Sequence, residues 1–431
     1  MNPPAAEPAT LTHDEFVPAT AAELSRFLAE NAAGPRQPVC PVGGRTALGY
    51  GYPPPAAAVT VSTARLAGVV DYPARDMTVT VEAGIRVDRL AEFLAAERQQ
   101  LPIDIAQSHR ATIGGAVATN TSGPRRFGHG TLRDYVIGIS AADGRGRLFK
   151  AGGRVVKNVA GYDLCKLLVG SLGTLAVVTQ VTLKLRPLPE TSSFVWASFD
   201  ALEDVEAALS ALTTSGTRPV VLDVLNADAA RLVVADARLA LPADRPALLV
   251  GVEGTERETA WQTDRLRNES APHGPRSLDT LAAKQAESLR LALTEFQVLA
   301  DEPVIFKANL LPSRTVEFAA RATSLGVAVQ AHAGNGIVVG KLPDAAASVE
   351  KAEQIVLRLR QLTQQARGNL VILECPADWK RRLRVFGDPE PAWPLMRRIK
   401  AALDPCNLLN QGRFFDTADD VFAKTDRQKD D

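Results

Sequence analysis

The chain has 431 residues, 46% of them hydrophobic, and its 49 lysines and arginines equal its 49 aspartates and glutamates. Because a single hydrophobic core rarely grows beyond about 250–300 residues, we expect two or more domains. The formal net charge of zero gives no basic excess of the kind that marks proteins binding nucleic acid or an anionic membrane surface.

The four cysteines lie far apart and form no CxxC pair. This spacing argues against structural zinc, an iron–sulfur cluster and a disulfide scaffold, so we expect no bound metal. The first residues lack the basic head and apolar core of a secretory signal, and no segment approaches the ~20 apolar residues of a membrane span. These features predict a soluble cytoplasmic protein.

The first half of the chain predicts short helices and strands in alternation. A capping box that begins at Thr20 precedes a helix ending near Gly34. Residues 57–63 and 77–84 are rich in β-branched side chains and predict strands, whereas residues 87–101 have helical spacing.

A hairpin and a linker follow. Residues 135–153 predict two strands joined around an Asp-Gly turn at residue 143. A short helix is expected at 160–170, and then a strand. Pro187 and Pro189 punctuate a linker after that strand, so we place a domain boundary there.

The second half predicts an α+β domain, with helices covering one face of a largely antiparallel sheet. The expected strands are 192–199, 219–226, 247–254, 304–310, 326–333 and 336–342. The expected helices are 203–212, 257–267, 282–296, 315–325, 348–366 and 390–403.

Three glycine-rich stretches in the first half are candidates for ligand binding: residues 41–51, 112–123 and 170–178. Glycine lets main-chain N–H groups turn toward a bound anion, although its ordinary role is turn formation. Neither a Walker loop nor a GxGxxG motif opening a βαβ unit is present, which disfavours a Rossmann dinucleotide site.

The order of these motifs resembles the FAD-binding domain of the vanillyl-alcohol oxidase / p-cresol methylhydroxylase (PCMH) family. The resemblance runs from about Ala19 to Pro189. Within that family, residues 152–164, 331–342 and 404–414 look most similar to the FAD-binding subunit of bacterial glycolate oxidase.

The resemblance implies a domain division and an α+β fold. We expect a flexible N-terminus (1–18), a two-lobed PCMH-type FAD-binding domain (19–189) and an α+β, ferredoxin-like cap domain (190–415). The last segment of the cap is expected to return to the FAD-binding domain. Residues 416–431 are charged, poor in apolar side chains, and expected to be disordered.

The resemblance also implies FAD-binding positions in three groups. The first loop would hold the pyrophosphate through main-chain amides, the second stretch would line the other side of the cofactor, and Val177 would contact the adenine. Residues 102–104 would approach the flavin. The implied cofactor-binding residues are Val42, Gly43, Gly44, Arg45, Thr46, Ala47, Leu48, Pro102, Ile103, Asp104, Thr112, Ile113, Gly114, Gly115, Ala118, Thr119, Asn120, Gly123 and Val177.

The sequence departs from the family pattern at four positions. Relatives that hold FAD covalently often have histidine where this chain has Arg45, so we predict non-covalent FAD. Leu172, Ala176 and Gln411 replace the usual glutamate, glycine and proline.

Catalytic residues are not identifiable from the sequence, and His332 and Arg413 are the weak candidates. Oxidising a 2-hydroxy acid requires a base, a cation for the carboxylate and hydride transfer to the flavin. His332 matches the first histidine of the "HxGDGNxH" stretch of related dehydrogenases, but Asn335 occupies the aspartate position and the second histidine is absent. Without a partner carboxylate, His332 is expected to be a satisfied histidine at a strand end.

Other titratable residues remain open as candidates. Lys307, Lys341 and Arg413 could bind a carboxylate, although lone cations are usually solvated. His109 and His129 flank the second glycine-rich stretch and could face the flavin. His13 and His273 are expected in loose or polar segments.

Three functions are therefore weighed. The first is an FAD-binding accessory subunit of a glycolate oxidase complex, cytoplasmic or peripheral to the inner membrane through its partners, a catalytic FAD subunit and an iron–sulfur subunit. The second is a self-sufficient FAD-dependent dehydrogenase of glycolate or D-lactate. The third is a flavin-free structural subunit, because a fold does not fix a function.

Overall fold

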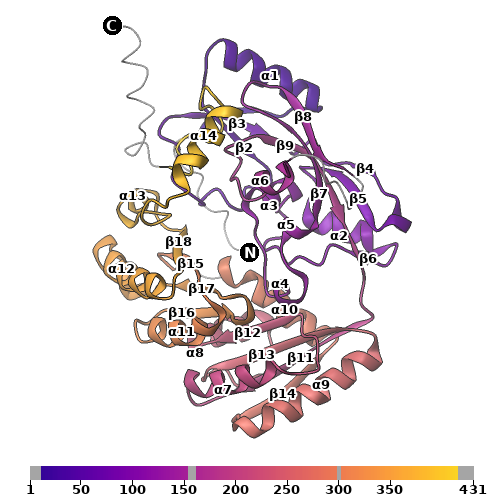
Figure 1. Cartoon of the computed structure of the whole chain (residues 1–431), viewed down its shortest axis with the longest axis vertical. Coiled ribbons are helices and arrows are strands. Elements are labelled where there is room, and N and C mark those ends of the chain that lie inside the picture. Colours follow the sequence, from indigo (N-terminus) through magenta and orange to yellow (C-terminus); the bar gives the residue numbers. More distant parts are fainter. Residues whose placement is uncertain (1–10, 154–161, 299–301, 416–431) are drawn as a thin grey trace.

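The computed structural model of the protein describes residues 11–153, 162–298 and 302–415. Its strands form two groups at opposite ends of the molecule (Figure 1). Strands up to residue 187 make three small sheets, which we call the first lobe, and strands from residue 191 make one large sheet, which we call the cap. The mixture of helices and antiparallel sheet confirms the α+β fold class.

The first lobe contains a parallel and an antiparallel sheet. The parallel sheet has the order β1-β3-β2, from Leu11–Phe16, Ala58–Ser62 and Val39–Val42. The antiparallel sheet has the order β4-β5-β9-β7-β8, from Val69–Asp71, Thr78–Glu82, Val177–Lys184, Val136–Ala142 and Leu148–Gly152. A two-stranded pair joins β6 (Gln99–Gln100) to β10 (Arg186–Pro187).

Most local predictions for this lobe are confirmed. Helix α1 spans Ala21–Ala33, and the Thr20 hydroxyl accepts a hydrogen bond from the Glu23 N–H at 3.1 Å. Strands β7 and β8 form the predicted hairpin. The other helices are α2 (Val87–Ala95), α3 (Ile113–Thr119), α4 (Arg126–His129), α5 (Leu132–Tyr135) and α6 (Leu164–Leu168).

The second glycine-rich stretch is a helix. Thr112 caps α3 by accepting a hydrogen bond from the Gly115 N–H at 3.3 Å, and Ile113 and Val117 are buried in the core of the lobe. Asn120 ends the helix in the left-handed conformation, with φ of 51°. One face of the stretch therefore anchors the core, which leaves its other face for a ligand.

The cap is one eight-stranded sheet in which every pairing is antiparallel. Its order is β14-β11-β13-β12-β16-β17-β15-β18. The strands are β11 (Thr191–Ser198), β12 (Val221–Leu225), β13 (Ala247–Gly254), β14 (Ser277–Ala282), β15 (Ile305–Asn309), β16 (Ala328–His332), β17 (Ile337–Lys341) and β18 (Asn369–Glu374). The two edge strands, β14 and β18, were not predicted from the sequence.

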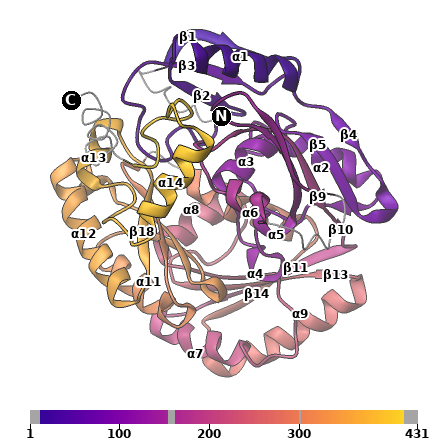
Figure 2. The ribbon, with the colours of Figure 1, turned by 45° about the horizontal axis from the view of Figure 1, so that its top comes forward.

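The expectation that helices cover one face of this sheet is wrong. Helices α7 (Leu202–Leu212), α9 (Glu256–Ser270), α11 (Thr315–Thr323) and α12 (Val349–Gln365) contribute to the core on the face away from the first lobe (Figure 2). Helices α8 (Ala227–Ala237) and α10 (Lys284–Glu295) contribute to a second core on the opposite face.

Strand β11 shows why the prediction failed. Val195 and Ala197 belong to one core, while Phe194 and Trp196 belong to the other, and all four are at most 3% exposed. A strand buried on both faces has a nearly continuous apolar sequence rather than an alternating one.

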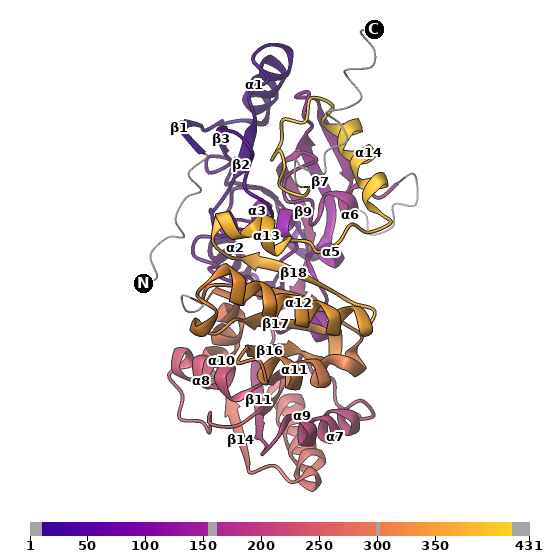
Figure 3. The same cartoon turned by 90° about the vertical axis from the view of Figure 1, so that its left-hand side faces the viewer.

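The end of the chain returns to the first lobe. The Val39 N–H donates to the Leu408 carbonyl at 2.8 Å, and the Asn410 N–H donates to the Val39 carbonyl at the same distance. Figure 3 shows α14 (Trp393–Leu403) beside α6 and β7 rather than beside the cap sheet. Among the described helices, none has both the length and the apolar character needed to cross a membrane.

Candidate functional site

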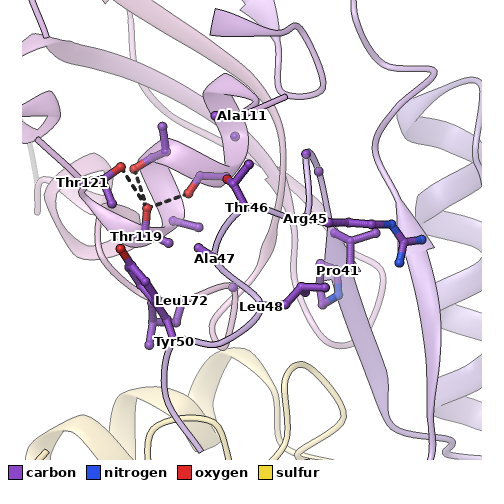
Figure 4. Close-up of a pocket in the computed structure, with 18 of the residues that line it drawn as sticks. Pro41, Arg45, Thr46, Ala47, Leu48, Tyr50, Ala111, Thr119, Thr121 and Leu172 are labelled. Atoms are coloured by element: carbon purple, nitrogen blue, oxygen red, sulfur yellow. Dashed lines mark hydrogen bonds between the residues drawn. The ribbon is translucent and has the colours of Figure 1, made fainter. Parts of the chain in front are cut away.

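A cleft runs between the glycine-rich stretches of the first lobe and encloses about 1120 Å³, its open mouth included (Figure 4). Its walls are residues 41–48, α3 with the residues that precede it, the loop 171–173 and the start of β9. The cap contributes Gln297 and Val298, which follow α10.

The first loop is pressed against the segment that leads into α3. A Cβ atom at Gly43 would lie 2.1 Å from the Thr112 Oγ1, and one at Gly44 would lie 1.9 Å from the Arg110 carbonyl oxygen. These two glycines are therefore required for the close approach of two chain segments. That approach forms one corner of the cleft.

The adjacent glycines of α3 have different neighbours. A Cβ atom at Gly114 would lie 2.7 Å from the Ala83 Cβ, whereas one at Gly115 would meet only the Thr112 Oγ1, at 3.2 Å. Both residues line the cleft, but only Gly115 has free space beyond it. Gly114 therefore serves packing, and Gly115 keeps the cleft open.

The third glycine-rich loop is fixed to the end of α3 by main-chain hydrogen bonds. The Gly170 N–H donates to the Val117 carbonyl at 2.9 Å, and the Leu172 N–H donates to the Ala118 carbonyl at 2.7 Å. The Leu172 carbonyl in turn accepts a hydrogen bond from the Asn410 side chain at 2.7 Å. The C-terminal segment thus holds the wall of the cleft.

The cleft gathers about two thirds of the positions implied by the family resemblance. Those that line it are Val42, Gly43, Gly44, Arg45, Thr46, Ala47, Leu48, Gly114, Gly115, Ala118, Thr119 and Val177. Those that do not are Pro102, Ile103, Asp104, Thr112, Ile113, Asn120 and Gly123.

Asp104 is placed in an inter-lobe ion-pair network instead. Its fully buried carboxylate lies 2.9 Å from the Arg125 Nε and also pairs with Arg290 of the cap helix α10. Burial alone would raise the pKa of Asp104, but Arg125 and Arg290 together hold it below the usual value. Asp104 therefore joins the two lobes and leaves no free oxygen for a cofactor.

Sequence reasoning missed Gln107. This residue lines the cleft in the left-handed conformation, with φ of 53°, and its main-chain N–H donates to Glu295 of α10 at 2.8 Å. Its side-chain Oε1 is buried and has no hydrogen-bond partner among the described residues. No motif marks it, because its position depends on a contact with the cap 188 residues away.

The walls of the cleft fit FAD. Most lining groups are main chain, small apolar side chains or hydroxyls, which suits a ligand with a planar ring, ribityl hydroxyls and phosphates. The orphaned Gln107 Oε1 could accept a hydrogen bond from it. Arg45, at the position of the covalent histidine, extends away from the loop toward Glu15, 3.0 Å from its carboxylate (Figure 4). This arrangement supports non-covalent binding.

The cap sheet carries a second polar site, which we call the Asp223 cluster: Asp223, Gln330 and His332. The His332 Nδ1 lies 2.8 Å from the Asp223 Oδ1, and the Gln330 amide donates to the other carboxylate oxygen at 2.9 Å. All three residues are at most 4% exposed. The expectation that His332 lacks a partner carboxylate is therefore wrong, because β12 places Asp223 directly opposite His332.

Two further cations lie near this cluster. Burial, followed by the charge of Arg126, lowers the pKa of Lys307. Burial also lowers the pKa of Arg126, although Asp134 and Asp223 oppose that effect. Within the described parts of the chain, the Arg126 Nε is buried and has no hydrogen-bond partner.

Helix α4 of the first lobe packs beside the Asp223 cluster. The Gly128 N–H donates to the Val220 carbonyl at 3.1 Å, and the Phe127 ring fills the space where a Cβ atom of Gly334 would lie, 2.2 Å away. None of the three cluster residues lines the cofactor cleft. The Asp223 cluster is thus not part of the cofactor cleft.

The remaining candidates have structural partners. His129 lies 2.6 Å from Glu253, and Lys341 lies 3.3 Å from Glu302 and 5.3 Å from the centre of the Phe296 ring. His109 is exposed, His273 ends a short 3₁₀ turn, and the side chain of His13 lies outside the described residues. Arg413 lines the cleft but donates its hydrogen bonds to main-chain carbonyls.

Two family models match the chain. The model of an FAD binding domain matches residues 15–152, and the model of the C-terminal domain of FAD linked oxidases matches residues 188–300 and 386–414.

Relatives and a solved structure agree with these matches. Glycolate oxidase subunit GlcD of Bacillus subtilis is 24% identical over 93% of this chain and 88% of its own length. Glycolate oxidase subunit GlcE of Escherichia coli is 39% identical, over 29% of this chain and 36% of its own length. The crystal structure of p-cresol methylhydroxylase with substrate bound superposes with a TM-score of 0.72, at 14% identity, covering 94% of this chain and 89% of that one.

The geometry and the matches agree on the cofactor and on the class of protein. The lining of the cleft suits FAD, and both family models describe FAD proteins. FAD is therefore the cofactor, and the protein is an oxidoreductase. The chain belongs to the FAD-linked oxidases with a PCMH-type FAD-binding fold.

Proposed function

We propose that this protein is the FAD-binding accessory subunit of a complex that oxidises glycolate to glyoxylate. Its partners would be a catalytic FAD subunit and an iron–sulfur subunit. Similarity to subunits GlcD and GlcE of glycolate oxidases supports this choice. The higher identity is to GlcE and is confined to 126 residues, so the likeness to that subunit is local.

One observation carries the accessory role. The Asp223 cluster contains the groups that could take a proton from a substrate, but its residues are at most 4% exposed, and Gly128 and Phe127 of α4 pack against Val220 and Gly334 beside it. A general base must come within hydrogen-bond reach of the proton that it removes. A base buried in this way does not meet this condition, so oxidation of the acid would take place on the partner subunit.

The chemistry divides between cofactor and protein as follows. FAD, when bound, accepts electrons from a hydride donor or from another redox centre. The backbone of residues 42–48 and the wall at Gly115 would hold it, while Gln107 would accept one of its hydrogen bonds. The cap helix α10 would shield the mouth of the cleft from water through the contact of Glu295 with Gln107.

The alternative is a self-sufficient 2-hydroxy-acid dehydrogenase, and the cations favour it. Lys307 and Arg126 lie close enough for the charge of Arg126 to depress the pKa of Lys307. Two desolvated cations beside a histidine–carboxylate pair could bind a carboxylate and remove a hydroxyl proton, if α4 moved away. The flavin-free alternative loses its support, because the family assignment makes FAD the cofactor.

Anaerobic reduction of the purified holoprotein separates the two functions. We expect glycolate and D-lactate to leave the flavin absorbance near 450 nm unchanged in the isolated chain. Rapid bleaching of the wild type that Lys307→Met slows at least tenfold would establish the dehydrogenase instead. Arg360→Met, which removes a cation of α12 remote from the cluster, is the matched control.

Co-expression tests the complex directly. We expect the tagged chain to co-purify with an iron–sulfur protein and a second flavoprotein, and glycolate to bleach the flavin of that assembly. Recovery of a fully active chain without either partner would contradict the accessory role.

A further inference from the structure

Two buried cations from the C-terminal part of the chain donate hydrogen bonds to the end of the first glycine-rich stretch and the residue after it. Lys380 is 5% exposed and Arg413 is 6% exposed. Their side chains point to the same short segment, residues 48–52, and donate hydrogen bonds to all five of its carbonyl oxygens. We call Lys380 and Arg413 the clamp.

The two members of the clamp alternate along the segment. Lys380 donates to the carbonyls of Gly49 and Gly51, the latter at 3.0 Å. The Arg413 Nη1 donates to the carbonyls of Leu48, Tyr50 and Tyr52, at 2.8, 3.1 and 3.5 Å.

This arrangement fixes the direction of the peptide dipoles. In a trans peptide the C=O group and the following N–H group point in opposite directions. The N–H groups of Tyr50 and Tyr52 donate to the carbonyls of Ala47 and Arg413, so main-chain bonds hold the segment together with the clamp. Five carbonyls that converge repel one another, so this conformation depends on the clamp.

The surrounding charges leave the clamp with a net positive charge. Glu374 is a neighbouring carboxylate, and its Oε2 occupies the space that a Cβ atom of Gly49 would need, 1.8 Å away. Burial raises the pKa of Glu374, while Lys380 and Arg413 oppose that rise. Two cations facing one carboxylate leave an excess of positive charge beside residues 48–52.

We propose that Lys380 and Arg413 are positioning residues for the FAD diphosphate. They hold residues 48–52 in a conformation that keeps the loop 42–48 open to the cofactor, and they add positive potential next to that loop. The inference rests on the assignment of residues 42–48 to the diphosphate. It extends the cofactor site into residues 380–413, far beyond the matched FAD binding domain at 15–152.

Lys380→Met tests the clamp, because it removes the charge and keeps the length of the side chain. We expect the dissociation constant of the apoprotein for FAD to rise at least tenfold, and that of ADP, measured by competition, to rise by a similar factor. Lys380→Arg should restore most of the affinity, since guanidinium also donates to carbonyls.

Arg267→Met is the matched control. Arg267 of α9 also donates to a main-chain carbonyl, that of Leu278 on β14, which is the edge strand opposite β18 in the cap sheet. We expect this variant to lower the melting temperature without changing the affinity for FAD or ADP. Equal losses of affinity in Arg267→Met and Lys380→Met would overturn the proposal.

The pH dependence supplies a readout that a purely structural role would not change. Burial lowers the pKa of Lys380, although Glu374 and Cys375 oppose this effect and Arg413 reinforces it. The clamp charge is present below that lowered pKa, so ADP affinity of the wild type should fall as the pH rises toward 10.5. Cys375, with a pKa raised to about 12 by burial, stays neutral over this range.

Lys380→Arg should show a flat profile over the same pH range. A wild-type profile as flat as that of the arginine variant would contradict the role of the lysine charge. If Lys380→Met does not fold, Lys380→Gln and Arg413→Lys, which shorten or reshape the donor, repeat the affinity measurement.

Gly115→Val distinguishes failure of the clamp from failure of the cleft assignment. If Gly115→Val abolishes FAD binding and Lys380→Met leaves it unchanged, the clamp is refuted and the cleft stands. If both variants bind FAD like the wild type, the cofactor lies elsewhere and both inferences fall.

Discussion

The cofactor cleft and the seam between the lobes are neighbours that are built in opposite ways. The cleft is lined mainly by main chain, small side chains and hydroxyls. The seam is held by charged side chains: Asp104 with Arg125 and Arg290, and Glu253 with Arg125 and His129. The space for a ligand in the cleft therefore depends on the absence of large side chains. The contact between the lobes depends instead on specific pairs of charged side chains.

The largest expected effect tests the cleft. Gly115→Val should abolish FAD retention. A Cβ atom at Gly114 would meet Ala83, but one at Gly115 would point into free space, so the valine side chain would occupy the cleft. The ratio of flavin to protein absorbance after gel filtration measures the loss. The fold should persist, with a circular dichroism spectrum like that of the wild type.

Gly216→Val provides the control for this change. A Cβ atom at Gly216 would meet nothing within 4 Å in the described structure, so the same substitution in the cap should keep full flavin content. Normal FAD content in Gly115→Val would show that the cleft does not depend on the absence of a side chain at residue 115.

The second effect tests the seam. Asp104→Asn removes the buried charge that separates Arg125 from Arg290, and breaking a buried ion pair by removing one partner costs about 3–5 kcal/mol. Urea unfolding should show that loss in the free energy of unfolding. Glu92→Gln, which breaks an exposed pair with Arg89, should cost no more than about 1 kcal/mol.

The contribution of Asp104 should depend on pH in a defined direction. Its arginine partners hold its pKa below the ordinary value of 3.8, so its stabilisation is fully present above about pH 4 and is lost as the pH falls through the lowered pKa. The difference in unfolding free energy between wild type and Asp104→Asn should therefore shrink below pH 4. A constant difference from pH 7 to pH 3 would show that the seam does not rest on this charge.

The smallest expected effect lies between the two regions. Thr112→Val removes the hydroxyl that caps α3, which should cost about 1 kcal/mol in unfolding free energy. Thr112→Ser keeps the hydroxyl and should restore most of that stability. A loss of FAD binding larger than the loss of stability would mean that Thr112 serves the cofactor as well as the helix.

The sequence predicted the first lobe and its cofactor cleft much better than it predicted the seam between the lobes. Short-range signals identified the Thr20 cap and the hairpin at residue 143, because each depends on residues a few positions apart. The cleft was located differently, by the family resemblance of glycine motifs that lie in a characteristic order between residues 41 and 178. Even there, the separate roles of Gly114 and Gly115 needed the position of Ala83.

Long-range partners could not be predicted from the pattern. Asp104 and Arg290 are 186 residues apart, and Asp223 and His332 are 109 residues apart. A single aspartate in a strand or loop carries no signal of its partner, so Asp104 was assigned to the cofactor and Asp223 was overlooked. The prediction that helices cover only one face of the cap sheet was wrong for a similar reason. A strand that is buried on both faces lacks the alternation of apolar and polar residues that would show which side faces the solvent.

The pairing of Val39 with residues 408–410 has a consequence for biosynthesis. Strand β2 leaves the ribosome early, but the backbone partners for its outer edge are translated about 370 residues later, at an elongation rate of roughly 5–20 residues per second. The first lobe must wait for the last helix and the turns after it before its sheet edge is closed. The wall of the cleft at Leu172, which the Asn410 side chain holds, is likewise completed only after residue 410 has been translated.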